Sequence, residues 1–197
     1  NADVSLLCNG KKLRKEFGEV LFTDYGLSGP PVLQVSRAVE RENGDMKISL
    51  DLLPEYNFNE GCACLLERRK NLSKRTNENF LTGFTNKRVG QVILKICNLK
   101  LTDLVENLSD NDIKNIANVF KKFEFKVVGT TGFANSQVTS GGVSAREIDS
   151  NLECKKISGL FFAGELVDVD GDCGGYNLQW AWSSGCLAGI HAGKDAL

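Results

Sequence analysis

The sequence predicts an α+β protein in which β and helical regions follow one another along the chain. Short apolar runs between Gly, Pro and Asn turns fill the chain up to Pro54. Apolar residues at helical spacing dominate residues 55–123, and short apolar runs return from residue 124 onward. A last segment from Tyr176 to Gly193 is rich in small residues and predicts one more helix.

Composition places the chain among ordinary globular proteins. It has 197 residues, of which 42% are hydrophobic and 25% charged, with a net charge of −1. Such values exclude disorder, collagen and coiled coil, and a nearly neutral chain has no global field that recruits nucleic acid or anionic lipid. Residues 1–128 carry a net charge of +3 and residues 129–197 a net charge of −4, which predicts a boundary near residue 130.

The cysteine content predicts a reducing compartment. The odd number of seven is scattered over Cys8, Cys62, Cys64, Cys97, Cys154, Cys173 and Cys186. Reduced thiols in a cytoplasmic protein explain this better than a disulfide scaffold. The uncharged stretch from Cys173 to Gly193 contains five Gly and several amide and hydroxyl side chains, so no membrane span is expected.

The front and middle of the chain give the clearest element signals. Strands are predicted at Val4–Cys8, Glu19–Thr23 and Lys47–Leu53, with a hairpin turn at Asn9-Gly10 and a helix at Pro31–Glu40. Helices are predicted around Cys62–Leu72 and Val89–Cys97, with a short piece at Leu101–Leu108. Ser109 is then the expected N-cap of a helix whose apolar positions run from Ile113 to Phe123.

After that helix the pattern returns to β. Strands are predicted at Phe125–Gly129, Asn135–Thr139 and Ala145–Ile148. Leu160–Ala163 is a continuous apolar run that is typical of a buried parallel strand. In the closing helix Trp180 and Trp182 must face different sides, so at least one is expected in the core.

The segment from Gly164 to Gln179 carries the strongest functional pattern. An apolar run leads into Gly164 and Glu165, whose carboxylate could accept from a hydroxyl-rich ligand. Gly174 and Gly175 then expose backbone N–H groups with no Cβ in the way. The helix that follows points its partly positive N-terminus at the same place. Together these features favour a site that stabilises negative charge on a bound ring or carbonyl.

Three strings, in family order, resemble the YhiN/BaiN-type bacterial flavoproteins, which are NAD(P)/FAD-dependent oxidoreductases. Residues 159–193 closely resemble the C-terminal end of that family. Phe133-Ala-Asn-Ser-Gln-Val-Thr-Ser-Gly-Gly-Val143 resembles its A-x-V-T-x-G-G-V region. Leu21-Phe-Thr-Asp-Tyr-Gly-Leu-Ser-Gly-Pro30 resembles its F-T-H-x-G-x-S-G-P region.

The resemblance implies a split FAD-binding domain of the doubly wound type, interrupted by a β-barrel-like domain that is itself interrupted by helices. Residues 1–54 and 124–150 would form the barrel-like domain and residues 55–123 the helical insert. Residues 151–197 would be the closing strand and helix of the FAD-binding domain.

The same resemblance implies which residues contact the cofactor. Glu165 would contact the ribityl or pyrophosphate part of the flavin, and the segment from Gly174 to Asn177 would lie by the pyrimidine end of its ring. The full predicted set is Thr139, Gly141, Gly142, Gly164, Glu165, Gly174, Gly175, Tyr176, Asn177 and Gln179. No catalytic acid or base is identified.

Two departures from the family pattern carry expectations of their own. Asp24 stands where the family has His, so we assign no proton-transfer role there. The sequence contains no G-x-G-x-x-G, the fingerprint that binds the dinucleotide pyrophosphate. The chain also begins with Asn1-Ala2, and its single Met is Met46. We therefore expect the back half of a flavoprotein, which lacks the N-terminal half of the FAD-binding domain and retains little or no FAD.

Metal sites are not predicted. Three aspartates alternate at Asp168, Asp170 and Asp172. An EF-hand loop starting at the first of them would need Gly and Glu where Cys173 and Gln179 stand. Cys62-Ala-Cys64 has no partner pair, and the single His191 cannot complete a zinc site, so buried helix cysteines are expected.

Residues 68–100 are rich in bases. The nine are Arg68, Arg69, Lys70, Lys74, Arg75, Lys87, Arg88, Lys95 and Lys100, against Glu78 alone. A nucleic-acid patch, a site for a phosphate-bearing substrate or nicotinamide cofactor, and a solvated helical face are all consistent with this run. Thin aromatic interleaving favours the solvated face, and nucleic acid is the least favoured partner.

The sequence thus leads to two functional hypotheses. The first is a fragment of a cytoplasmic FAD-dependent oxidoreductase with an unknown small-molecule substrate, in which the chain supplies cap domains and a flavin-contacting segment and is inactive alone. The alternative is a non-catalytic module that binds a ligand or partner.

Overall fold

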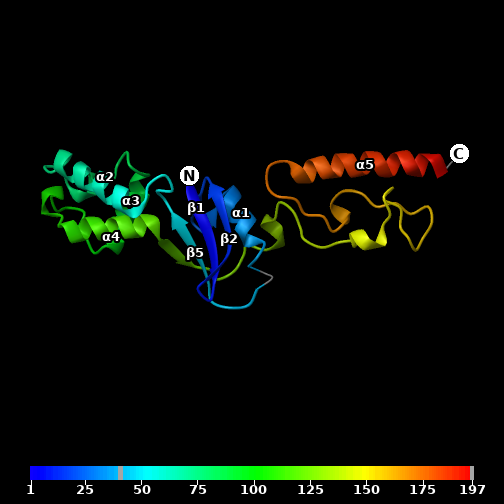
Figure 1. The fold of residues 1–197 in the computed structure, drawn as a ribbon, viewed down its shortest axis with the longest axis horizontal. Coiled ribbons are helices and arrows are strands. Elements are labelled where there is room, and N and C mark those ends of the chain that lie inside the picture. The colour runs from blue at the N-terminus through cyan, green and yellow to red at the C-terminus, as the bar shows by residue number, and fades with distance from the viewer. Residues whose placement is uncertain (40–41, 196–197) are drawn as a thin grey trace. The chain divides into compact units, whose positions relative to one another are not determined.

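A computed structural model describes residues 1–39 and 42–195 (Figure 1). It divides into two compact units, residues 1–128 and residues 129–197. The division coincides with the change in charge balance along the sequence. The finer partition into barrel-like, helical and FAD-binding segments stays a prediction about the parent protein.

Unit 1 is built on a four-stranded antiparallel sheet with the order β2-β1-β5-β6. Its strands are β1 (Ala2–Cys8), β2 (Lys11–Gly18), β5 (Met46–Asp51) and β6 (Phe123–Lys126). Asn9 and Gly10, with φ of 50° and 80°, form the predicted turn between β1 and β2. This turn returns the chain at once into β2, a strand that was not predicted, and the predicted strand Glu19–Thr23 is present only as the short strand Leu21–Thr23.

A second, smaller hairpin follows the sheet. It joins β3 (Leu21–Thr23) to β4 (Gly26–Ser28), and the Phe22 ring of β3 lies 6.2 Å from the rings of Phe123 and Phe125 on β6. Among the described residues β2 and β6 are not hydrogen-bonded to each other, so the sheet is not closed into a hydrogen-bonded barrel. The aromatic contact nevertheless brings this hairpin to the β6 edge.

The helix after the hairpin is shorter than predicted. It is α1 (Pro30–Ser36), and a proline occupies its first turn, where no backbone donor is needed. The predicted end at Glu40 lies outside the described residues.

The helices predicted for residues 55–123 form between β5 and β6. They are α2 (Phe58–Asn71), α3 (Lys87–Ile96) and α4 (Asp110–Lys121), and Figure 1 shows them gathered at one end of unit 1. Asn57 and Ser109 cap α2 and α4 with reciprocal capping boxes, which confirms the predicted cap at Ser109. Two short 3-10 turns, η1 (Asn77–Asn79) and η2 (Val105–Asn107), link the helices.

One continuous hydrophobic core joins sheet and helices in unit 1. Fully buried Leu6 and Leu50 from the sheet belong to the same cluster as Leu65, Ile93 and Phe120 from the three helices. Burying such a side chain contributes about 1.5–3 kcal/mol to the stability of the fold. The helical part and the sheet therefore stabilise each other through one shared core.

All seven cysteines are free thiols. Cys62 and Cys64 are half-buried instead of buried, which corrects the expectation for that pair: both lie on α2, but only Gly61 and Leu65 of that helix are fully enclosed. Cys97 at the end of α3 is also half-buried, and loss of solvent raises the pKa of its thiol to about 11.

Unit 2 has little regular structure before its final helix, and three predicted strands are wrong. The predicted strand Asn135–Thr139 is irregular beyond the end of the 3-10 turn Phe133–Asn135, and the 3-10 turn Ala145–Glu147 replaces most of the predicted strand Ala145–Ile148. In the run Leu160–Ala163 only Phe161 pairs, through a single antiparallel bridge to Glu153. An apolar run becomes a parallel strand only beside parallel neighbours, whereas this run hydrogen-bonds to the antiparallel residues Leu152 and Cys154.

The closing helix is α5 (Tyr176–Asp195), close to the predicted range. It packs on a small core of Ile148, Leu152, Val167 and Ala188. Trp180 packs against that cluster whereas Trp182 is 70% exposed, as their alternation predicted. Among the helices formed by the described residues, none combines the length and hydropathy needed to cross a bilayer.

Candidate functional site

Two segments that carry the predicted motifs lie side by side in unit 2. The backbone N–H of Val143 donates to the carbonyl of Leu166 at 2.8 Å, and the N–H of Asp168 donates to the carbonyl of Val143 at 2.9 Å. These bonds form a parallel bridge between Val143 and Val167. The loop from residue 139 and the loop from residue 164 are thereby joined in one structure.

Glu165 is the polar centre of this junction. Its Oε1 accepts from the backbone N–H of Thr139 at 2.7 Å and from the Thr139 hydroxyl at 2.9 Å. The backbone donor first, and the hydroxyl second, lower the pKa of the Glu165 carboxyl because both stabilise its charged form. Oε2 makes no hydrogen bond to any described residue, so it can accept from a ligand hydroxyl.

Two glycines of the loop from residue 139 allow the two loops to approach each other closely. A Cβ on Gly142, whose φ is +133°, would lie 2.5 Å from the carbonyl oxygen of Leu166, so no side chain fits there. Gly141 donates its N–H to Oδ1 of Asp168 at 3.1 Å. Sequence reasoning weighed Asp168 only as a calcium ligand, because nothing in the local pattern signals a partner 27 residues away.

Gly164 is held by the middle of α5. Its N–H donates to the hydroxyl of buried Ser184 at 2.9 Å, and its carbonyl accepts from the indole N–H of Trp180 at 2.9 Å. Ser184 in turn donates to the carbonyl of Trp180 at 2.6 Å. These two residues, one helical turn apart, position the predicted loop and were absent from the predicted set.

The start of α5 presents the second group of predicted residues. Gly175 has φ of 92°, and a Cβ there would meet no atom within 4 Å. Gly175 and Tyr176 stand at the N-terminus of the 20-residue helix α5, where the first backbone N–H groups have no acceptor within the helix. Tyr176 itself is 66% exposed. A helix N-terminus favours a negatively charged ligand group.

Two predicted residues of α5 are engaged within the protein. The amide of Asn177 accepts from the N–H of Gly171 at 2.8 Å and donates to its carbonyl at 3.1 Å, which fixes the loop that precedes Gly174. Gln179 donates to the Ser183 hydroxyl at 2.9 Å on the exposed side of the helix. Both side chains therefore form their hydrogen bonds within the protein.

The predicted residues therefore fall into two groups. Thr139, Gly141, Gly142, Gly164 and Glu165 are brought together, whereas no hydrogen bond between described residues joins Gly174 and Gly175 to Glu165. The first group offers a carboxylate oxygen and the second lies at the N-terminus of α5. This donor set fits a ligand that is both hydroxyl-rich and anionic, as FAD is. The described residues hold no cluster of three or more His, Cys, Asp or Glu side chains arranged for a metal ion.

Unit 1 carries an antiparallel sheet with three helices inserted between β5 and β6, and unit 2 carries the junction around Glu165. The family model described as HI0933-like protein barrel and H2TH domain matches residues 1–138. The chain belongs to this family, which includes the YhiN/BaiN-type flavoproteins and confirms the resemblance seen in the sequence.

Three curated relatives match nearly the whole chain. It is 34% identical over 98% of its length to the 3-dehydro-bile acid delta(4,6)-reductase of Clostridium scindens. It is 33% identical to ribosomal RNA dihydrouridine synthases of Haemophilus influenzae and Escherichia coli, over 92% and 95% of its length. The chain spans 48%, 43% and 45% of these three proteins, which is about half of each.

Proposed function

We propose that this chain forms the cap domains and the flavin-contacting C-terminal segment of an FAD-dependent oxidoreductase that adds hydrogen to a carbon–carbon double bond. The joining of the Thr139 and Gly164 loops around Glu165 carries the proposal. The names of the relatives support the reaction class. One states a reduction, and the other names a product with two more hydrogens than uridine.

FAD would supply the hydride chemistry when bound, with NAD(P)H as the proposed electron donor. This chain's residues would bind and orient it. Oε2 of Glu165 would accept from a ribityl or ribose hydroxyl, while Oε1 keeps the carboxylate fixed on Thr139. The N-terminus of α5, at Gly175 and Tyr176, would face negative charge at the ring or carbonyl.

The N-terminal half of the FAD-binding domain is the proposed partner of α5. Leu178, Trp182 and Ile190 are 62%, 70% and 51% exposed, and with exposed Cys186 they recur every fourth residue along one stripe. An apolar stripe of this length is normally covered. The neighbouring small residues would let a parallel sheet approach closely, as the split, doubly wound domain requires.

A complementation experiment tests this proposal. The chain is expressed alone and together with the preceding half of the parent, and the visible flavin absorption is measured after desalting. We expect a colourless chain and a yellow pair. Trp182→Glu should abolish flavin retention by the pair, whereas Ser183→Glu, on the exposed side of the same turn, should preserve it. A chain that retains flavin alone, or a pair that associates without flavin, contradicts the proposal.

A non-catalytic ligand- or partner-binding module remains the second candidate. One observation favours it: unit 1 has its own continuous core and could stand as a binding domain. NAD(P)H oxidation by the complemented pair distinguishes the two, since a binding module would consume none. The proposed location is the cytoplasm, which the seven free thiols support.

A further inference from the structure

The sequence contains two Asn-Gly pairs, and the fold of unit 1 brings them together. Asn9-Gly10 forms the turn between β1 and β2, and Asn43-Gly44 lies in the loop that leads into β5. A Cβ on Gly44 would lie 2.6 Å from the side-chain nitrogen of Asn9, so the two pairs lie against each other. A change in one pair therefore alters the surroundings of the other.

An Asn-Gly pair contains both groups that are needed for asparagine to lose its amide. The backbone nitrogen of the glycine can attack Cγ of the asparagine, because no Cβ on the glycine obstructs the approach. Ammonia leaves as a succinimide ring forms, and water then opens the ring to give aspartate or isoaspartate. The reaction needs no enzyme and no oxidant. Its rate in a folded protein therefore depends on whether the side chain can move onto the following backbone nitrogen.

The first pair is held away from this reaction by two hydrogen bonds. The backbone N–H of Asn9 donates to the carbonyl of Asp45 at 2.9 Å. The side-chain Oδ1 of Asn9 accepts from the N–H of Asp45 at 3.0 Å. While these bonds last, Cγ of Asn9 cannot turn onto the nitrogen of Gly10. Conversion of Asn9 thus requires its contact with Asp45 to open first.

The side chain of the second pair has no such restraint. Asn43 is exposed and lies outside the helices and strands. Its backbone carbonyl accepts from the thiol of Cys8 at 3.7 Å, but its side-chain amide makes no hydrogen bond to any residue that the structure describes. The side chain of Asn43 can therefore rotate until its Cγ meets the nitrogen of Gly44.

We propose that Asn43 is a site of spontaneous deamidation in the folded protein, and that its conversion releases Asn9, which converts second. Isoaspartate carries the main chain through its side chain and so lengthens the loop by one carbon atom. The loop has no room for this where Gly44 meets Asn9 and Cys8, since a Cβ on Gly44 would lie 2.6–2.8 Å from both side chains. The loop must therefore shift, and the hydrogen bonds between Asn9 and Asp45 are the ones that it loses.

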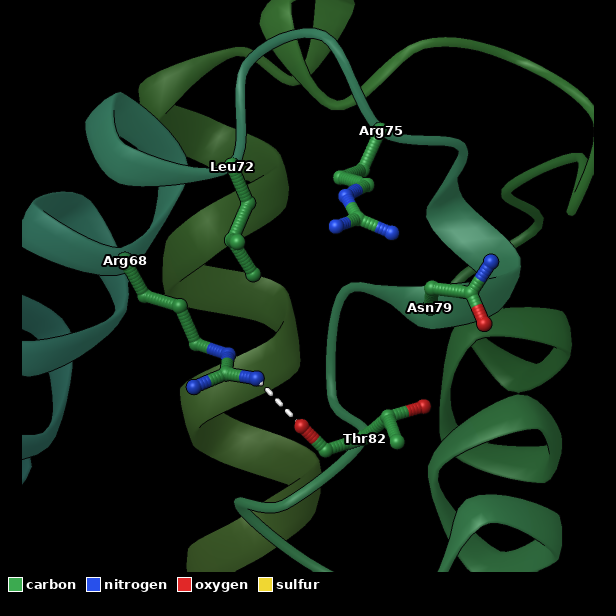
Figure 2. A pocket seen from close by; sticks show the side chains of 5 residues that line it. All are labelled: Arg68, Leu72, Arg75, Asn79 and Thr82. Carbon is green, nitrogen blue, oxygen red and sulfur yellow. Dashed lines mark hydrogen bonds between the residues drawn. The ribbon is translucent and has the colours of Figure 1, made fainter.

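Two asparagines elsewhere in unit 1 separate the effect of the glycine from the effect of access to solvent. Asn98 is exposed and has a φ of 59°, but Leu99 follows it. Asn79 lines a hollow of about 230 Å³ (Figure 2), and Phe80, whose carbonyl accepts from Arg68, follows it. In both cases the Cβ of the second residue obstructs the attack, so neither asparagine should convert in the time that Asn43 needs.

The test is incubation of the full chain in a mildly alkaline buffer, followed over time by peptide mapping with mass spectrometry. We expect the initial rate at Asn43 to exceed that at Asn9 by about 10-fold, since two hydrogen bonds must open at Asn9. Asn9 should then accelerate. In Asn43→Gln it should keep its initial rate, because glutamine would have to close a larger and less favoured ring. Asn98→Gln is the matched control and should leave both rates unchanged.

Several results would overturn the inference. Equal initial rates at Asn9 and Asn43 in the folded chain would show that the fold does not protect Asn9. An Asn43 that converts as slowly as Asn98 would show that its loop is closed to the reaction. Acceleration of Asn9 in Asn43→Gln would show that the two sites are independent. In urea both pairs should convert at similar rates, so a tenfold difference that persists there would exclude the fold as its cause. Flavin takes no part in this reaction, so the outcome is independent of the proposed function.

Discussion

Thr139 donates both its backbone N–H and its hydroxyl to a single oxygen of Glu165, at 2.7 and 2.9 Å. The two residues are 26 positions apart, and each opens one of the two loops that form the candidate site. Because one carboxylate oxygen holds both donors, the other oxygen stays available to a ligand. The contact therefore organises the site before a ligand arrives, which lowers the entropic cost of binding.

The first prediction concerns the division of this contact between its two donors. Glu165→Gln replaces a charged acceptor with a weaker neutral one, so the amide of residue 139 should exchange with deuterium faster than in the wild type. Thr139→Val removes only the hydroxyl and should give a smaller increase at the same amide. Hydrogen exchange across residues 139–143 measures both effects. Thr131→Val, an exposed substitution of the same kind, should change nothing there, and unaltered exchange in Glu165→Gln would refute the role given to the carboxylate.

The second prediction follows from the lowered pKa of Glu165. A carboxyl whose pKa is lower in the folded state stabilises that state above its ordinary value of 4.5, and the contribution is lost as pH falls through the folded value. The junction should therefore persist at pH 4.5 and weaken only in more acidic solution. The NMR shift of the Thr139 amide reports this titration, and Glu165→Gln should abolish it. A midpoint at or above 4.5 would contradict the assignment.

The third prediction concerns the contact between Gly164 and α5. Ser184→Ala leaves the N–H of Gly164 without its acceptor, which should cost about 1–3 kcal/mol in the free energy of unfolding. The neighbouring Ser183 is exposed, so Ser183→Ala should cost less than about 0.5 kcal/mol. Urea unfolding followed by Trp fluorescence measures both variants, because Trp180 loses its packed environment on unfolding. Equal effects of the two variants would show that the Gly164 contact contributes little.

Helix α4 shows what the sequence can predict. Its apolar positions Ile113, Ile116 and Phe120 repeat at helical spacing, and Ser109 supplies a cap within the same stretch. Every signal is local, so no knowledge of the rest of the fold is needed. The run Leu160–Ala163 is the opposite case, because an apolar run becomes a parallel strand only when parallel neighbours exist, and those are set by distant parts of a protein.

The candidate site likewise contains residues that the sequence reveals and residues that it does not. Thr139 and Glu165 stand out in the sequence because they lie in strings that resemble a known family. Asp168 and Ser184 do not, because their contacts to Gly141 and Gly164 span 27 and 20 residues with no period to reveal them. The partners of Arg68 could not be foreseen either, since they are backbone carbonyls, and any residue type can supply a carbonyl.

The last prediction ranks the reactivity of the thiols. The thiolate is the species that iodoacetamide alkylates. With a pKa of about 11, Cys97 at pH 8 holds on the order of 100-fold less thiolate than it would at the ordinary value of 9.0. Half-burial against the core slows its reaction further, whereas Cys186 is exposed on α5. Peptide mapping by mass spectrometry should therefore find Cys97 labelled at least about 10-fold more slowly than Cys186. The rate at Cys97 should rise about tenfold per pH unit up to about pH 10, below its pKa of about 11.

In urea the two cysteines should react alike. A difference in rate that survives unfolding, or similar rates in the native protein, would contradict burial as the cause.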